Sequence, residues 1–324
     1  MLKNIGLNLS SLNYYISKSK NRLDVIIEFL DIAKKNNIRG LEFYPSTFIE
    51  NKDFYKLDKT CSNIRLNNLF YILDCDKIFD LNAVKKLIIN AKLSKKKIVV
   101  IVLTKILECK RHLIKKDWDE YIEDSIKFLK KLEPIAREYD VKIAIENHQD
   151  FDSNDFIRIL DSFDKDDTIG INFDIGNAFA VCEDPMVFCK KIIDKINNVH
   201  IKDYDIKETK EGFMLLNCSI GKGSVKLKPI INFIEKKKPN ITKMIEPGQL
   251  TPRHIKKNNK IFWKKIGPRL IDEKKKFDAS LSEAILANKE KSFKNLNNYK
   301  NNDEFIFKFL KNQIIESINY TKKL

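Results

Sequence analysis

The sequence has no apolar stretch long enough to cross a membrane. Its longest apolar runs, such as residues 98–103, have the length of buried strands, whereas a membrane-spanning helix needs about 20 apolar residues. Residues 1–4 also lack the positive region and the apolar core of a secretory signal. We therefore expect a cytoplasmic protein with no membrane partner.

Closely spaced cysteine pairs are absent as well. The six cysteines are scattered along the chain without a CxxC pair, which argues against both a disulfide framework and a thiolate zinc site. Free cysteines ordinarily behave as small residues of the core or the surface. We expect these thiols to be reduced.

Acidic residues are outnumbered by basic ones. The chain has 61 lysines and arginines against 45 aspartates and glutamates, a formal net charge of +16. Clustered basic side chains bind nucleic acid by releasing counterions from its phosphates. Here the excess is mostly lysine spread along the whole chain, and the lysine triplets at residues 95–97, 236–238 and 274–276 fall at expected helix ends or turns. A basic surface without a nucleic-acid partner is therefore the favoured interpretation.

Apolar runs of strand length alternate with longer stretches of helical period. A length of 324 residues with 43% hydrophobic residues indicates a globular protein with a large core. The runs predict strands at residues 5–9, 40–44, 69–73, 97–103, 141–146, 168–174, 198–202 and 241–246. Helical spacing predicts helices at residues 23–36, 81–93, 118–139, 155–163, 185–196 and 227–237. This alternation favours an α/β fold of the (β/α)8 TIM-barrel class over an open doubly wound sheet.

Two segments depart from simple alternation. Residues 207–225 contain an apolar run and a glycine-rich turn, which predict a hairpin or a lid. Residues 256–324 predict a helical C-terminal extension to a barrel of residues 1–255, with residues 261–266 beginning the helix that closes the barrel. An amphipathic terminal helix is indicated by Phe305, Phe307, Phe309, Leu310, Ile314, Ile315 and Ile318. Its apolar stripe must be buried, against the barrel or against a neighbouring subunit of a homo-oligomer.

Four of the predicted strands end near a residue that can bind a metal. Side chains alternate along a strand, so Glu146, Asp174, His200 and Glu246 are all expected on the inner face of the barrel. A single acidic residue at a strand end is ordinarily a helix cap or part of a surface ion pair. Because the carboxyl ends of barrel strands meet on one rim, four such residues at the same phase predict a shared metal site.

Short motifs around these residues resemble a known family. They are Glu146-Asn147-His148, Phe173-Asp174-Ile175-Gly176-Asn177, Val199-His200-Ile201-Lys202-Asp203, Ile220-Gly221-Lys222-Gly223 and Ile245-Glu246-Pro247. In this order they are similar to successive motifs of the xylose-isomerase-like TIM-barrel superfamily, the sugar phosphate isomerase/epimerase group. The resemblance is strongest over residues 142–247. It implies that Glu146, Asp174, His200 and Glu246 bind one divalent cation, with manganese expected first and magnesium, cobalt or zinc also compatible.

The same resemblance implies an enzyme of carbohydrate metabolism. A cation that holds the carbonyl and the neighbouring hydroxyl of a sugar stabilises the enediolate left when a proton departs. We therefore expect a metal-dependent isomerase or epimerase with a small carbohydrate substrate, in which Glu146 and Glu246 act as acid and base as well as ligands. The residues expected to bind substrate are His148, Lys202, Glu42, Asn177 and Arg253.

Three alternatives stay open at this stage. Other members of the group carry out metal-assisted dehydration or decarboxylation of sugar-derived acids, which use similar enediolate chemistry. The group also contains the endonuclease IV type of AP endonuclease, but its three-zinc cluster needs more histidines than the four of this chain, and Asn177 stands where one of them is required. The third alternative is an inactive barrel that serves as a binding or scaffold protein, against which the complete ligand set argues.

Overall fold

The computed structural model describes residues 3–12, 22–43, 70–75, 77–163, 167–247, 251–287 and 302–324. Two of the predicted strand boundaries, at residues 44 and 69, lie outside these ranges.

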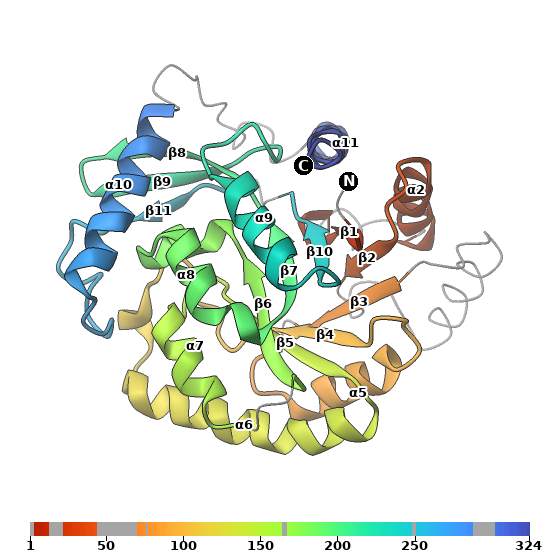
Figure 1. The fold of residues 1–324 in the computed structure, drawn as a ribbon, viewed down its shortest axis with the longest axis horizontal. Coiled ribbons are helices and arrows are strands. Elements are labelled where there is room, and N and C mark those ends of the chain that lie inside the picture. The colour runs from red at the N-terminus through yellow and green to blue at the C-terminus, as the bar shows by residue number, and fades with distance from the viewer. Residues whose placement is uncertain are drawn as a thin grey trace.

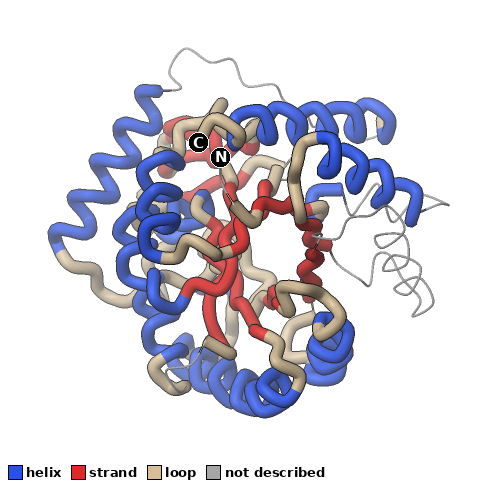
Figure 2. The backbone as a smooth tube through the Cα atoms, turned by 45° about the vertical axis from the view of Figure 1, so that its right-hand side comes forward, coloured by secondary structure: helices blue, strands red, loops and turns tan. Residues whose placement is uncertain are grey.

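Eight parallel strands in the described part of the chain close into a barrel. Their order around it is β1, β10, β7, β6, β5, β4, β3 and β2. Figure 2 shows the strands in the middle of the molecule with helices around them. The strands are β1 (Ile5–Asn8), β2 (Gly40–Phe43), β3 (Phe70–Cys75), β4 (Ile98–Ile101), β5 (Lys142–Glu146), β6 (Ile169–Asp174), β7 (Ile196–Ile201) and β10 (Thr242–Ile245). Each overlaps one of the predicted strands, so the predicted α/β barrel is confirmed.

Helices connect the strands on the outside of the barrel (Figure 1). They are α2 (Arg22–Lys35), α5 (Leu81–Ala91), α6 (Trp118–Glu138), α7 (Ser153–Leu160), α8 (Pro185–Ile192) and α9 (Leu227–Lys237). Short 3-10 helices are η1 (Ser10–Leu12), η2 (Arg111–Leu113), η3 (Gly176–Val181) and η4 (Ile193–Lys195). None of the helices in the described segments has both the length and the apolar composition to span a membrane.

Aspartate side chains determine where several of these helices begin. The N-caps of α5, α6, α7 and α8 accept hydrogen bonds from backbone N–H groups of the first turn, and these residues are Asp80, Asp117, Asp152 and Asp184. An aspartate in this position pairs a donor that the helix itself leaves free. The caps therefore set the length of the loops that leave the carboxyl ends of the strands.

Alternation of side chains divides the apolar residues into two layers. A small buried cluster inside the barrel consists of Ile72, Ile98, Val100, Ala144 and Met244. The larger core lies between the strands and the helices. The inward phase predicted for Ala144 and Met244 is confirmed, and because the side-chain period is two, Glu146 and Glu246 have the same phase.

The predicted hairpin after the seventh strand is present. β8 (Tyr204–Thr209) and β9 (Gly212–Asn217) pair antiparallel, and β11 (Arg253–Ile255) joins β9 to complete a small sheet. An added Cβ at Gly212 would lie 2.1 Å from the backbone oxygen of Ile255. Glycine at this turn therefore permits the close approach of β11.

The prediction that residues 261–266 begin the closing helix is wrong. They form turns, and the next helix, α10 (Ile271–Ala287), begins after Gly267 and Pro268. Proline disfavours the helical conformation of the residue before it, and glycine is a poor helix former. These two residues separate the turns from α10.

The last helix, α11 (Asp303–Thr321), lies between α2 and α9 around the barrel (Figure 1). Lys311 forms an ion pair with Glu28 of α2, and the ring of Phe307 lies edge-on to that of Phe29, with centroids 6.1 Å apart. The helix packs against the barrel, which was the first of the two expected arrangements. We propose that α11 is the eighth helix of the barrel, in which case the barrel does not end at residue 255.

Replacing Ile314 by alanine should destabilise the fold. The Ile314 side chain on α11 has no exposed surface, whereas that of Ile315 is 37% exposed. Loss of a buried isoleucine side chain lowers the free energy of unfolding by about 2–5 kcal/mol, and urea unfolding would measure it. The control Ile315→Ala should change stability by no more than about 0.5 kcal/mol. Equal effects of the two variants would contradict the packing of α11 through this face.

Candidate metal and substrate site

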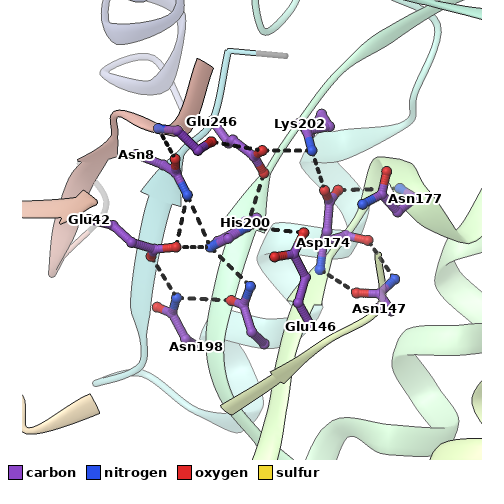
Figure 3. A network of polar contacts seen from close by, with 12 residues as sticks. Asn8, Glu42, Glu146, Asn147, Asp174, Asn177, Asn198, His200, Lys202 and Glu246 are labelled. Carbon is purple, nitrogen blue, oxygen red and sulfur yellow. Dashed lines mark hydrogen bonds and ion pairs between the residues drawn. The ribbon is translucent and has the colours of Figure 1, made fainter. Parts of the chain in front are cut away.

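The predicted metal ligands lie together at the carboxyl ends of their strands. Glu146 and Asp174 are the last residues of β5 and β6, His200 is near the end of β7, and Glu246 directly follows β10. Each offers one ligand atom, and these atoms all lie within 4.8 Å of one another. Figure 3 shows the four side chains directed toward one another. A cation with ligand bonds of about 2.0–2.6 Å fits between atoms at this spacing. The predicted convergence is confirmed, while the ligand roles stay a prediction.

The strand register explains the convergence. Asp174 is paired with His200 between β6 and β7, and Met244 is paired with His200 between β10 and β7. Directly paired residues direct their side chains to the same face of a sheet. Glu246 lies two positions after Met244, so its side chain enters the barrel one step nearer the mouth.

Two of the converging atoms lack a hydrogen bond. His200 Nδ1 and Glu246 Oε2 lie 3.0 Å apart, and both are buried without a hydrogen-bond partner among the described residues. Glu146 Oε1 lies 3.9 Å from the same nitrogen. A cation bound to both atoms would give each of them a ligand bond in place of their contact with each other. The donor set of three carboxylates and one imidazole therefore fits a divalent cation.

Glu42 lies behind His200. Its Oε1 atom is 2.5 Å from His200 Nε2. Because a carboxylate accepts hydrogen bonds, this contact places a ring proton on Nε2. Against the lowering effect of burial, the carboxylates of Glu42 and Glu246 raise the pKa of His200 well above its usual value, so Nδ1 is the nitrogen that would bind a metal after losing its own proton. Asn8 and Asn198 donate hydrogen bonds to the two carboxylate oxygens of Glu42, at 2.8 and 3.1 Å.

Glu42 was also predicted to contact the substrate, and that role stays a prediction. Its side chain has no exposed surface, and its oxygens are engaged by His200, Asn8 and Asn198. The register pairs Glu42 with Asn8, the last residue of β1. Glu42 is therefore suited to orienting His200.

Lys202 lies inside the same cluster. Its Nζ atom is 2.6 Å from Asp174 Oδ2 and 2.8 Å from Glu246 Oε1. Burial alone would lower the pKa of Lys202, but the carboxylates of Asp174 and Glu246 raise it well above its usual value. The side chain is therefore a fixed positive charge whose hydrogen bonds go to two of the predicted ligands.

Burial dominates the acidity of the cluster. It raises the pKa of Glu146 to about 7 and that of Asp174 to about 7. Burial also acts to raise the pKa of Glu246, but the positive charges of Lys202 and His200 hold it well below its usual range. The three carboxyl groups thus differ in how readily they ionise. Their combined negative charge is stabilised by bound protons or by a bound cation.

The other predicted substrate contacts lie around this cluster. His148 follows β5, burial lowers its pKa, and its Nδ1 has no hydrogen-bond partner within the described segments. Asn177 lies in η3, where its backbone N–H donates to Asp174 Oδ1 at 3.2 Å. The positive charge of Arg253 on β11 acts on Tyr204, whose hydroxyl contacts Asn177. The substrate roles of these residues stay predictions.

Sequence analysis did not single out Asp74. It lies on β3, two positions after the inward Ile72, and its Oδ1 is buried without a partner among the described residues. Burial raises its pKa, and the nearby charge of Glu42 raises it further. Alternation along the third strand could have identified it, because a residue two positions after an inward-facing one also faces inward.

A curated relative covers part of the chain. The 3-oxo-isoapionate decarboxylase of Pectobacterium atrosepticum is 24% identical over 126 residues, which are 38% of this chain and 46% of that protein. The chain therefore spans about half the length of this relative.

Solved structures share the fold. The 3-keto-D-glucoside 4-epimerase of E. coli matches with a TM-score of 0.55 and 13% identity, over 86% of this chain and 97% of that one. The IOLI protein, solved with a zinc atom, matches with a TM-score of 0.52 and 16% identity, over 90% of this chain and 100% of that one. At these identities the likeness shows the fold alone.

A family model matches more than half of the chain. The model for the xylose isomerase-like TIM barrel matches residues 79–259. The matched segment contains Glu146, Asp174, His200 and Glu246 together with the strands that carry them. The chain belongs to the xylose isomerase-like TIM-barrel family.

Proposed function

We propose that the protein is a divalent-metal-dependent isomerase or epimerase that moves a proton on a small sugar or sugar derivative. The observation that carries this proposal is the convergence of four metal-binding side chains within 4.8 Å, at the end of the barrel where barrel enzymes have their active sites. An epimerase is among the structures with the same fold. Manganese is the expected metal, with magnesium, cobalt or zinc also compatible, and one similar structure holds zinc.

Proton transfer falls to the two glutamates in this proposal. A divalent cation in the site would polarise a carbonyl group and stabilise the enediolate formed when the neighbouring carbon loses a proton. Glu146 comes from β5 and Glu246 from the end of β10, and β6 and β7 lie between these strands around the barrel. The two carboxylates therefore approach a substrate from different sides, as removal and return of a proton on opposite faces requires.

Lys202 and His148 support this chemistry. The charge of Lys202 helps to hold the pKa of Glu246 low, so that this carboxylate stays ionised, as a metal ligand must be. The ammonium group is also placed to stabilise negative charge that develops on a substrate oxygen. His148 has a buried ring nitrogen with no partner in the described part of the chain, which suits a hydrogen bond to a substrate hydroxyl.

A metal-dependent lyase is the second candidate function. The observation that favours it is the similarity to a decarboxylase. Loss of carbon dioxide from a keto acid leaves the same kind of electron-rich oxygen that a cation and Lys202 would stabilise. The same residues would then act on a sugar-derived acid.

We propose no nucleic-acid partner. His254 lies in the β11 sheet, where its Nε2 is 2.9 Å from Thr209 Oγ1, and His112 lies in η2. Neither belongs to the cluster, so these histidines do not extend it to the three-metal site of the endonuclease type. The cytoplasmic location and a homo-oligomer stay predictions.

The first test is exchange of carbon-bound hydrogen with solvent. Protein loaded with Mn²⁺ should introduce deuterium from D₂O into a ketose, an aldose, a sugar phosphate or a sugar acid, measured by NMR. Glu246→Gln should slow this exchange by at least about 100-fold, since an amide cannot accept the proton, and should leave the circular dichroism spectrum unchanged.

Glu211→Gln serves as the control for this test. Glu211 is exposed and pairs with Lys256 away from the cluster, so its variant should exchange at the wild-type rate. Full activity of Glu246→Gln would rule out its assigned role. Release of carbon dioxide from a sugar acid without hydrogen exchange on any other substrate would favour the lyase.

Glu42→Gln should weaken metal binding. The substitution keeps the shape of the side chain but removes the charge that holds the proton on His200 Nε2, and loss of such a partner typically lowers metal affinity by about 10–100-fold. Calorimetric titration with Mn²⁺ would measure the change. Glu133→Gln, in an exposed pair with Arg137, is the matched control, and equal affinities of the two variants would contradict the orienting role.

Metal binding should release protons and weaken as the pH falls below about 7. Burial raises the pKa of both Glu146 and Asp174 to about 7 without a metal, whereas a ligand must be ionised to bind. Below that pH the cation must displace protons, and above it these carboxyls are already ionised. Calorimetry in buffers of different ionisation enthalpy should detect about one to two released protons near pH 6 and few near pH 8. A constant affinity over this interval would disprove the linkage.

A further inference from the structure

The side-chain amide of Asn177 is bound at one end and free at the other. Its oxygen, Oδ1, accepts hydrogen bonds from the Tyr204 hydroxyl at 2.9 Å and from Gln149 Nε2 at 3.3 Å. Its nitrogen, Nδ2, has no hydrogen-bond partner among the residues that the structure describes. This nitrogen is also shielded from water, since the residue as a whole is only 1% exposed. A buried donor of this kind requires an acceptor that the described residues do not supply, and a bound ligand can provide it.

A backbone group sets the direction of these hydrogen bonds. The N–H of Glu108 donates to Gln149 Oε1 at 3.1 Å. Because a backbone N–H can only donate, the oxygen of Gln149 must face it, and the NH₂ group of Gln149 must face Asn177. That NH₂ group can likewise only donate, so it meets the oxygen of Asn177. The orientation of the Asn177 amide therefore follows from the position of one main-chain donor.

The backbone at the start of this sequence of hydrogen bonds is strained. Glu108 and Gln149 have φ angles of 59° and 75°, and Cys109, with φ 53°, donates its N–H to the Gln149 carbonyl at 2.9 Å. Residues other than glycine rarely adopt the left-handed region, and such conformations occur where surrounding contacts determine them, often at functional sites. The strain supports a role for the contact between residues 108–109 and Gln149 beyond simple packing.

We propose that Gln149 and Tyr204 are positioning residues that hold the Asn177 amide with its NH₂ group presented to the substrate as a hydrogen-bond donor. The identity of the ligand as a sugar derivative rests on the proposed function. Asn177 lies beside Asp174 (Figure 3), to which its own backbone N–H donates, so its amide borders the cluster of predicted ligands. The free NH₂ group selects a carbonyl, hydroxyl or carboxylate oxygen at this position and disfavours a protonated amine.

Neutron diffraction from crystals of deuterated protein tests the orientation directly, because it distinguishes an ND₂ group from an oxygen atom. The expected map shows both deuterium atoms of Asn177 on the atom that faces away from Tyr204 and Gln149. The reversed amide would overturn the proposal. This result does not depend on activity, so its failure is distinguishable from a failure of the proposed function, which would appear as no hydrogen exchange on any sugar.

Gln149→Glu tests whether the orientation matters for substrate. One carboxylate oxygen still accepts from Glu108, while the other attracts the NH₂ group of Asn177 and reverses its amide. For the sugar that exchanges fastest, we expect KM to rise by about tenfold, the factor expected for the loss of one hydrogen bond, with unchanged affinity for Mn²⁺. An unchanged KM would overturn the proposal, and an equal loss of Mn²⁺ affinity would show a structural role instead.

Tyr204→Phe removes one of the two donors and leaves Gln149 in place. The amide should keep its orientation, so KM should rise less than in Gln149→Glu. Tyr121→Phe is the matched control, since the Tyr121 hydroxyl donates to the Leu103 carbonyl at 2.8 Å instead of to the site, and its KM should equal that of the wild type. A larger effect of Tyr204→Phe than of Gln149→Glu would contradict the part assigned to Gln149.

Discussion

The mutual repulsion of buried carboxylates at the mouth of the barrel is the constraint on which the site depends. Glu146, Asp174 and Glu246 converge there, and Glu42 lies directly behind His200. Within this cluster Lys202 and His200 are the groups that carry positive charge against them. Carboxylates removed from water repel one another strongly and bind protons unless a cation is near. Only a rigid frame holds such groups together, and the closed barrel provides it because each ligand is carried by, or directly follows, a strand paired on both sides.

Hydrogen bonds from residues around the cluster fix the orientation of side chains within it and at its border. Glu42 holds a ring proton on His200 Nε2, and Gln149 determines which end of the Asn177 amide is free. Glu108 extends this order to the small sheet, since its Oε1 accepts from the backbone N–H of His254 on β11 at 2.8 Å. β11, which follows the last barrel strand, thus supports the hydrogen-bond network that borders the predicted ligands.

The parts that were predictable from sequence are those with a local signal. The inward phase of Glu146 and Glu246 follows from alternation with Ala144 and Met244. The hairpin follows from the apolar run at residues 212–216, which forms β9, but it turns at residues 210–211 and not at the glycine-rich residues 221–223. The start of the closing helix was placed too early, because residues 261–266 have apolar residues that a helix could bury, whereas α10 begins only after Gly267 and Pro268. The burial of the terminal stripe was expected, but its position between α2 and α9 depends on contacts such as Lys311 with Glu28, 283 positions apart.

The sequence by itself determined the barrel class and the four side chains that meet at its mouth, because a period of two along each strand fixes which residues point inward and parallel strands end on one rim. Only the tertiary structure decided what each of these side chains touches. Glu42 and His200 are 158 positions apart, and Lys202 meets Asp174 and Glu246 from a different strand of the barrel. Such contacts depend on the closure and register of the whole sheet, for which no single stretch of sequence carries a signal.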